Sequence, residues 1–185
     1  LARRMKSPLL LSLKYNPNDT DFSQQISLLE RSEVQAIVIW GTPRESALFL
    51  RQMKEHGMKQ AVFCSTSLAV PEFLEGVGTF GEGVIVALPY DFHSSDTDTL
   101  MFGKRFRAEY GQEPDMFAAY TYDGIRIIIE AIRSAGLNRA RIRDAITEMT
   151  DFNGVTGKIS FDKTGRNKAA SIKLSIITNG RFQLP

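Results

Sequence analysis

Short apolar runs alternate with amphipathic segments through the first half of the chain, and this alternation constrains the fold most strongly. The runs predict strands at residues 9–15, 34–40, 60–64 and 83–88. The segments between them carry apolar residues at helical spacing, as at Phe22, Ile26 and Leu29. The run 34–40 is almost unbroken, which suits a parallel strand that is covered on both faces. The order of elements therefore predicts an α/β fold built on a doubly wound parallel sheet.

The pattern changes after Pro89. Helical spacing predicts helices at about 97–110, 115–135 and 139–149, with Asp115 and Asn138 as N-caps. Strands follow at 158–161 and 171–178, and Asn179-Gly180 predicts a hairpin turn. We expect three segments: an α/β segment at 1–88, a mainly helical segment at 89–157, and returning strands at 158–185. On the longest helix, the series Ile125, Ile128, Ile129 and Ile132 predicts a buried face, against which Tyr120 and Tyr122 also pack.

Composition argues against several classes of function. The formal charge is +2, from 23 Lys+Arg against 21 Asp+Glu, so no dominant positive field is available to hold nucleic acid. Apolar runs stay well short of the roughly 18 residues that span a bilayer. The single cysteine, Cys64, leaves no internal disulfide and no multi-cysteine metal site. We expect no metal and no cofactor.

Catalytic motifs are absent from the sequence. A literal G-x-G-x-x-G at Gly76, Gly78 and Gly81 follows a helical segment and leads into a strand, so it predicts a turn and not a dinucleotide site. Cys64 ends an apolar strand and is expected to be a buried, inert thiol, although a role in lining a pocket stays open. Glu45 is expected on a solvated helix face. We therefore expect a protein that is not an enzyme.

Two loops follow neighbouring predicted strands and are the best candidates for a binding site. An open parallel sheet binds its ligand beyond the carboxyl ends of its strands. The rule selects residues 40–45, with Trp40, Gly41, Thr42 and Arg44, and residues 64–67, with Ser65 and Thr66. These loops offer hydroxyls and backbone donors to a small polar group. The alternative is that Thr42 and Ser67 only cap the helices that follow and that Trp40 only packs.

Several short segments, taken in order, resemble one family. They are 19–22, 49–52, 57–59, 106–111, 114–115, 118–124 and 154–165. Together they look like the C-terminal half of the periplasmic substrate-binding proteins of branched-chain amino-acid-type ABC transporters, the type I or Leu/Ile/Val-binding-protein-like group. The resemblance implies two α/β lobes, joined by three crossovers, that close on a ligand between them. It assigns 1–88 to the second lobe, 89–157 to the first lobe and 158–185 to a return to the second.

A full member of this family is roughly twice as long as this chain. We therefore expect that the N-terminal half of the same protein is missing here, in agreement with the start at Leu1, and that any export signal lies upstream. Faces that the absent half would cover are expected to be exposed. The resemblance also places Tyr90 near a crossover, where it either touches the ligand or stiffens the hinge.

The resemblance also bears on the ligand. In amino-acid-binding members, the loop matching Gly41-Thr42 contributes an aromatic residue and the loop matching Ser65-Thr66 contributes a glutamate that pairs with the ammonium group. Here Thr42 and Thr66 hold those positions. An ammonium group buried without a counter-charge is costly. We expect a small organic solute, with a carboxylate or aromatic acid favoured over an amino-acid-like one.

The expected function is therefore solute capture for an ABC importer, in the periplasm or outside the cell, with delivery to a membrane permease. Ligand contacts are expected from Trp40, Gly41, Thr42, Ser65, Thr66 and Tyr90, with Arg44 as an anion partner. Anchoring to a membrane through the missing N-terminus stays open. The alternatives are a sensory ligand-binding domain of a receptor or regulator, and an α/β enzyme that uses Thr66 or Cys64.

Overall fold

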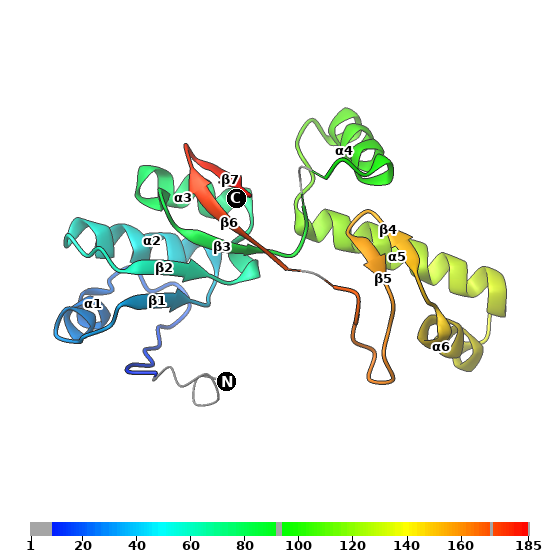
Figure 1. The fold of residues 1–185 in the computed structure, drawn as a ribbon, viewed down its shortest axis with the longest axis horizontal. Coiled ribbons are helices and arrows are strands. Elements are labelled where there is room, and N and C mark those ends of the chain that lie inside the picture. Colours follow the sequence, from blue (N-terminus) through cyan, green and yellow to red (C-terminus); the bar gives the residue numbers. More distant parts are fainter. Residues whose placement is uncertain (1–8, 92–93, 171, 185) are drawn as a thin grey trace. The chain divides into compact units, whose positions relative to one another are not determined.

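The computed structural model describes residues 9–91, 94–170 and 172–184. They form two compact units (Figure 1). Unit 1 contains the chain up to Ala87 together with the residues from Leu174 onward, and unit 2 is Leu88–Lys173. The sequence placed the return to the first segment at residue 158, whereas the structure places it after Lys173. The difference arises because residues 157–159 pair with a neighbouring strand inside unit 2.

A five-stranded sheet forms the centre of unit 1, in the order β1-β2-β3-β6-β7. Its strands are β1 (Ala36–Ile39), β2 (Ala61–Cys64), β3 (Ile85–Leu88), β6 (Lys173–Thr178) and β7 (Arg181–Gln183). The first three strands are parallel neighbours, and β6 and β7 form an antiparallel hairpin. The mixed α/β architecture with a parallel sheet is the one that the sequence predicts.

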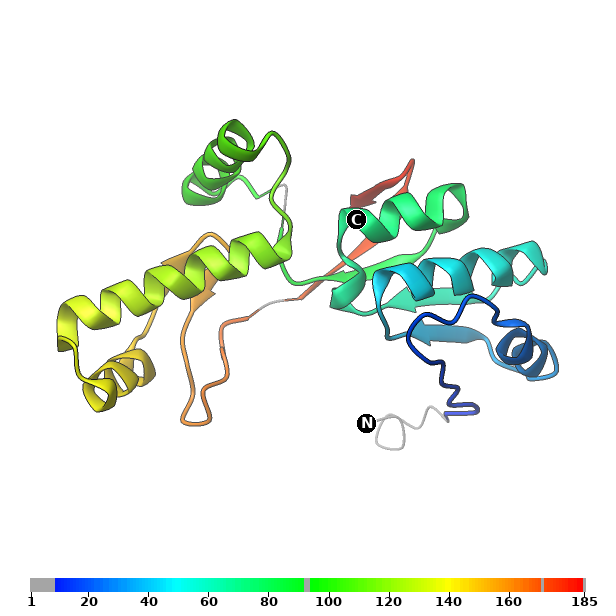
Figure 2. The same cartoon turned by 180° about the vertical axis from the view of Figure 1, so that it is seen from behind.

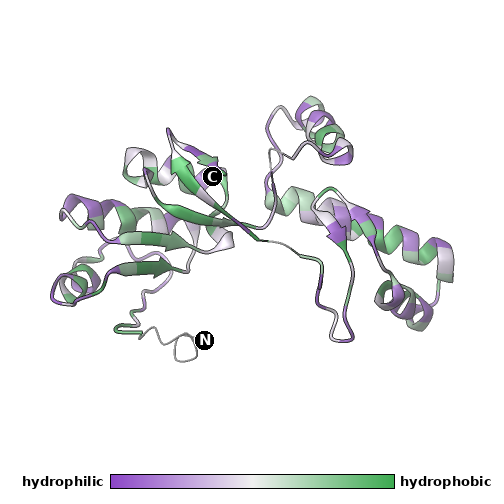
Figure 3. Ribbon diagram, viewed as in Figure 1, coloured by the Kyte–Doolittle hydropathy of each residue, from purple (hydrophilic) through white to green (hydrophobic). Residues whose placement is uncertain are grey.

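Helices cover one face of this sheet. They are α1 (Ser23–Glu30), α2 (Pro43–Glu55) and α3 (Pro71–Val77), with 3-10 turns η1 (Thr66–Leu68) and η2 (Gly78–Gly81). Figure 2 shows α2 and α3 in front of the strands, and Figure 3 shows the strands as the most hydrophobic part of the unit. Fully buried Leu50, Met53, Phe73, Val86 and Ile177 form the core between helices and sheet. Burial of these apolar side chains holds the layers together.

Burial alternates along β1 in the described residues, where the sequence predicts a strand covered on both faces. Ile37 and Ile39 are buried, whereas Val38 is 70% exposed. Successive side chains of a strand point to opposite faces of the sheet. Among the described residues, α1, α2 and α3 lie on one face of the sheet (Figure 2). Ile37 and Ile39, which share a face of β1, are the buried residues of the strand.

The prediction of a strand at residues 9–15 is wrong for this structure. The segment has no regular secondary structure. Its Lys14 carbonyl accepts a hydrogen bond of 3.1 Å from the Gln25 side chain of α1. A strand requires a ladder partner, and the sheet of the described residues ends at β1 without reaching this segment.

Turn chemistry in unit 1 follows the sequence closely. Asn179 and Gly180 both have positive φ, at 52° and 69°, and join β6 to β7 as the hairpin signal predicts. Gly76, Gly78 and Gly81 lie at the end of α3 and within η2, which is the predicted turn. Pro43 occupies the first turn of α2, where its missing N–H costs nothing.

The described residues of unit 2 form three helices and a small hairpin. The helices are α4 (Thr97–Tyr110), α5 (Met116–Ala135) and α6 (Arg139–Glu148), and the hairpin pairs β4 (Phe152–Gly154) with β5 (Gly157–Ile159). Asp115 and Asn138 cap α5 and α6 as predicted, since their side chains accept from the backbone N–H groups of Ala118 and Arg141. No helix of the described residues has both the length and the apolar character needed to cross a membrane.

The buried face of α5 differs from the predicted one. Ala119, Asp123, Ile127 and Ala131 are buried, whereas Ile125 is 53% exposed. Ile128, Ile129 and Tyr122 are exposed as well. The β4–β5 hairpin hydrogen-bonds to the side of the helix that carries Asp123.

Asp123 fastens α5 to the β4–β5 hairpin. Its buried carboxylate accepts from the Val155 N–H at 2.8 Å, from the Thr156 N–H at 2.9 Å and from the Thr156 hydroxyl at 2.7 Å. A Cβ on Gly154 would stand 2.4 Å from the carboxylate, so only glycine fits there. The match of Asp123-Gly124 and Gly154-Val155-Thr156 to one family pattern thus has a structural basis: the two segments bond to each other.

Candidate functional site

The two loops selected from the sequence leave the sheet side by side. Ile39 and Cys64 are partners in the parallel ladder of β1 and β2, so both loops start at the same edge of the sheet. The Ser67 hydroxyl donates to the Gly41 carbonyl at 3.0 Å and therefore ties the second loop to the first. Ser65 and Ser67 share a hydrogen bond of 2.7 Å between their hydroxyls. The structure thus brings Gly41 and Ser65 together through Ser67, a residue the sequence suggested only as a helix cap.

Gly41 is required at its position by a close approach. A Cβ there would stand 1.5 Å from the Tyr15 hydroxyl and 3.0 Å from the Ser46 hydroxyl. Both of these hydroxyls are buried, and neither has a hydrogen-bond partner within the described part of the chain. Buried hydroxyls are normally satisfied. The two buried hydroxyls of Tyr15 and Ser46, next to the Gly41 backbone, are therefore available as hydrogen-bonding groups.

Thr42 and Glu45 begin α2. Thr42 occupies the N-cap position, but its hydroxyl donates to the Glu45 carboxylate instead of accepting from the first-turn N–H groups. The Asn18 N–H donates to the same carboxylate at 2.9 Å. These hydrogen bonds, with that of Thr42 the strongest, lower the pKa of Glu45 below its usual value of 4.5. Glu45 is buried, which corrects its expected place on a solvated helix face.

The remaining residues of the loops differ in exposure. Trp40 is 83% exposed, so within the described residues it is not a packing residue, contrary to one alternative from the sequence. Arg44 and Thr42 are exposed, and Thr66 is half-buried at the start of η1. An indole, a guanidinium and several hydroxyls therefore stand at the carboxyl edge of the sheet.

Cys64 and Tyr90 are both buried, in different units. Burial raises the pKa of the Cys64 thiol to about 12, which keeps it protonated and unreactive near neutral pH. Tyr90 belongs to unit 2, where it lines a cavity of about 390 Å³ with residues of 88–91 and 94–99, the β4–β5 hairpin and Lys173. Burial, with a smaller contribution from Asp123, raises the pKa of its phenol to about 12. Among the described residues, no three His, Cys, Asp or Glu side chains gather as a metal site would require.

Comparison with known families shows the family of this chain. The family model described as "Periplasmic binding protein" matches residues 3–178. This chain belongs to that family. Among curated relatives, the Leu/Ile/Val-binding protein homolog 2 of Brucella abortus (strain 2308) is 29% identical over 151 residues, which are 81% of this chain and 40% of the relative. The chain therefore spans well under two thirds of that relative's length.

Solved structures show the same fold. The leucine binding protein LivK of Thermotoga maritima is 29% identical, with a TM-score of 0.86 over 92% of this chain and 49% of its own. A solute binding protein of Rhodopseudomonas palustris, solved in complex with benzoate, shares 15% identity and a TM-score of 0.86 over 98% of this chain and 51% of its own. At that identity the second likeness shows the fold alone.

Proposed function

We propose that this chain is part of the solute-binding component of an ABC importer, which captures a small organic acid and delivers it to a membrane permease from the periplasm or the outer surface of the cell. The observation that carries the proposal is the pair of loops at the carboxyl edge of β1 and β2, joined by the Ser67–Gly41 hydrogen bond. Membership of the periplasmic binding protein family supports solute capture over catalysis.

The donors on these loops favour an anionic solute. Ser65 and Thr66 contribute hydroxyls, and the N-terminal turn of α2 directs backbone N–H groups and its partial positive charge toward the same edge. Arg44 adds a full positive charge within that turn. A carboxylate is the simplest small group that matches hydroxyl, N–H and guanidinium donors together.

The acceptors on the same loops disfavour an ammonium group. Residues 40–45 and 64–67 contain one carboxylate, Glu45, and it already accepts from Thr42 and Asn18. An α-ammonium held in this site would therefore lack a counter-charge from these loops. We propose a carboxylate or aromatic acid as the solute, with Trp40 covering its apolar part.

A thermal-shift screen of the longer protein that contains this chain tests the proposal. Amino acids, aliphatic acids and aromatic acids are compared at equal concentration, because a ligand that binds only the folded state raises the unfolding temperature. The proposal predicts a shift with one class of acid. A shift with amino acids alone would contradict the choice of solute, and no shift with any class would contradict solute capture.

Thr66 offers a matched pair of variants. Thr66→Glu introduces a carboxylate at the loop, so it is expected to weaken binding of the acid at least tenfold. Thr66→Gln adds a side chain of the same size without charge and is expected to weaken binding much less. Equal losses in the two variants would mean that size, and not charge, governs the site.

A further inference from the structure

Two hydroxyl groups from other parts of unit 1 lie against the backbone of Gly41. One belongs to Tyr15, in the segment before α1, and the other to Ser46, in the first half of α2. The place of a Cβ on Gly41 is 1.5 Å from the Tyr15 oxygen and 3.0 Å from the Ser46 oxygen. The two oxygens therefore neighbour each other directly beside the first of the two loops in the proposed solute site.

Both hydroxyls are buried without a hydrogen-bond partner among the described residues. Ser46 is fully buried, and a serine hydroxyl within a helix commonly bonds to the carbonyl four residues earlier. Here the Thr42 carbonyl accepts from the Ser46 N–H at 3.1 Å, and the hydroxyl stays unbonded. A buried hydroxyl without a partner costs free energy, so two of them beside one binding loop call for a reason.

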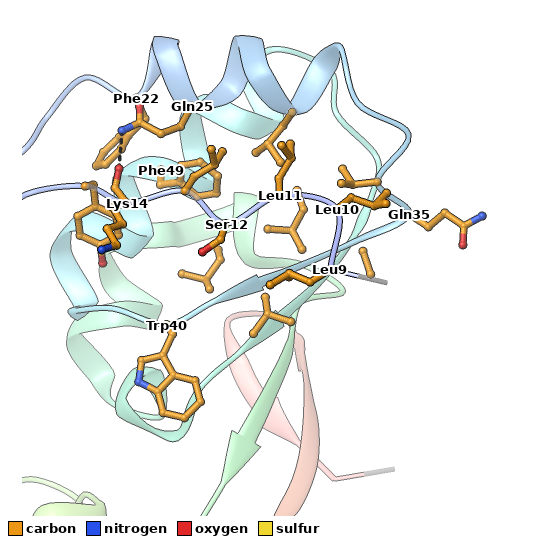
Figure 4. Close-up of a pocket in the computed structure, with 18 of the residues that line it drawn as sticks. Leu9, Leu10, Leu11, Ser12, Lys14, Phe22, Gln25, Gln35, Trp40 and Phe49 are labelled. Carbon is orange, nitrogen blue, oxygen red and sulfur yellow. Dashed lines mark hydrogen bonds between the residues drawn. The ribbon is translucent and has the colours of Figure 1, made fainter. Parts of the chain in front are cut away.

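The Tyr15 side chain is held in place by its surroundings. Its ring meets the ring of Phe22 edge to face, with the centroids 5.7 Å apart, and Phe22 meets Phe49 of α2 in the same way. The Lys14 carbonyl, next in the chain, accepts a hydrogen bond of 3.1 Å from the Gln25 side chain (Figure 4). The Tyr15 hydroxyl therefore has little freedom to find a partner elsewhere.

The loop beside these hydroxyls is the part that can move. Gly41 has no side chain, so its backbone changes conformation at a lower steric cost than that of other residues. The neighbouring Trp40 is 83% exposed and points away from the aromatic packing around Phe22 (Figure 4). Residues 40 and 41 are therefore held less firmly than the 14–22 segment that lies against them.

We propose that Tyr15 and Ser46 are positioning residues of the solute site, whose hydroxyls gain hydrogen bonds with the backbone of residues 40–42 when a solute binds. A small shift of the loop supplies the partners that the hydroxyls lack in the free protein. A ligand shifts such an equilibrium by the difference between its affinities for the two loop positions. The new hydrogen bonds belong only to the solute-bound position and therefore strengthen binding.

This inference rests on the proposed function, because it names residues that set the position of the same loop. Tyr15→Phe in the longer protein removes one hydroxyl and keeps the ring. In titration calorimetry with isocaproate, an aliphatic acid, and phenylpropanoate, an aromatic acid, the variant is expected to bind at least twofold more weakly whichever acid the unaltered protein binds. The urea midpoint of the solute-free variant is expected to stay the same or rise, because the hydroxyl has no partner there.

Ser46→Ala is expected to give the same combination of weaker binding and undiminished stability. Tyr110→Phe is the matched control, because it removes the same group from an exposed ring in unit 2 and should change neither quantity. A loss of affinity smaller than twofold in either Tyr15→Phe or Ser46→Ala would overturn the proposal. A lower urea midpoint of either solute-free variant would also overturn it, because the hydroxyl would then be bonded before the solute arrives.

The unaltered protein separates this inference from the proposed function. Heat from neither acid with the unaltered protein would contradict solute capture itself, and the inference with it. Heat with the unaltered protein, together with unchanged affinity in the two variants, would leave the proposed function standing and would contradict only the role of Tyr15 and Ser46.

Discussion

Removing the Asp123 carboxylate is expected to release the β4–β5 hairpin from α5. In Asp123→Ala, the buried Val155 N–H loses its partner, which costs about 1–3 kcal/mol. The two hydrogen bonds from half-buried Thr156 are worth about 0.5–1.5 kcal/mol each, because water replaces them in part. The sum is about 2–6 kcal/mol, a large share of the roughly 5–15 kcal/mol by which domains are stable.

Urea unfolding followed by far-UV circular dichroism measures this loss, because the helices of unit 2 contribute to the signal together with those of unit 1. With a slope of about 2 kcal/mol per molar urea, a loss of about 4 kcal/mol lowers the midpoint by about 2 M. Thr156→Val is the matched control, because it removes only the hydroxyl bond and is expected to cost about 1 kcal/mol. An Asp123→Ala variant no less stable than Thr156→Val would refute the reasoning.

Three further outcomes are expected. Hydrogen bonds lower the pKa of Glu45 in the folded protein, so the unfolded chain binds this proton at higher pH and the carboxylate stabilises the fold above about pH 4.5. This stabilisation is lost on acidification, and Glu45→Gln should therefore flatten the acidic part of a plot of urea midpoint against pH. Cys64 should resist alkylation by iodoacetamide at pH 8 until the protein is unfolded, and rapid labelling of the folded protein would contradict its burial. Ser67→Ala should weaken solute binding at least threefold in a titration, since it frees the second loop from Gly41, while Ser27→Ala on α1 should leave affinity unchanged.

Local sequence signals predict the elements that depend on neighbouring residues. Pro43 at the start of α2, Asp115 at the start of α5 and the Asn179-Gly180 hairpin all follow from backbone preferences within a few residues. The parallel order of β1, β2 and β3 follows from the alternation of strands and helices.

Features that depend on distant partners escape the sequence. The 9–15 run has the composition of a strand but lacks a ladder partner in the described chain. Glu45 resembles a surface residue until Asn18 and Thr42 are seen to donate to it. Ser67 gains its role only because β1 and β2 are adjacent, which brings its hydroxyl to the Gly41 carbonyl. Each error or omission concerns a contact between residues far apart in sequence or an absent neighbour.

Titration calorimetry of the longer protein with matched pairs of solutes tests the central claim most directly. Leucine is compared with isocaproate, which is leucine without its amino group, and phenylalanine with phenylpropanoate. A site with hydroxyl, N–H and guanidinium donors but no free carboxylate predicts that at least one of the two acids binds tenfold or more tightly than its amino-acid partner. Tighter binding of leucine or phenylalanine, or heat from none of the four solutes, would contradict the account.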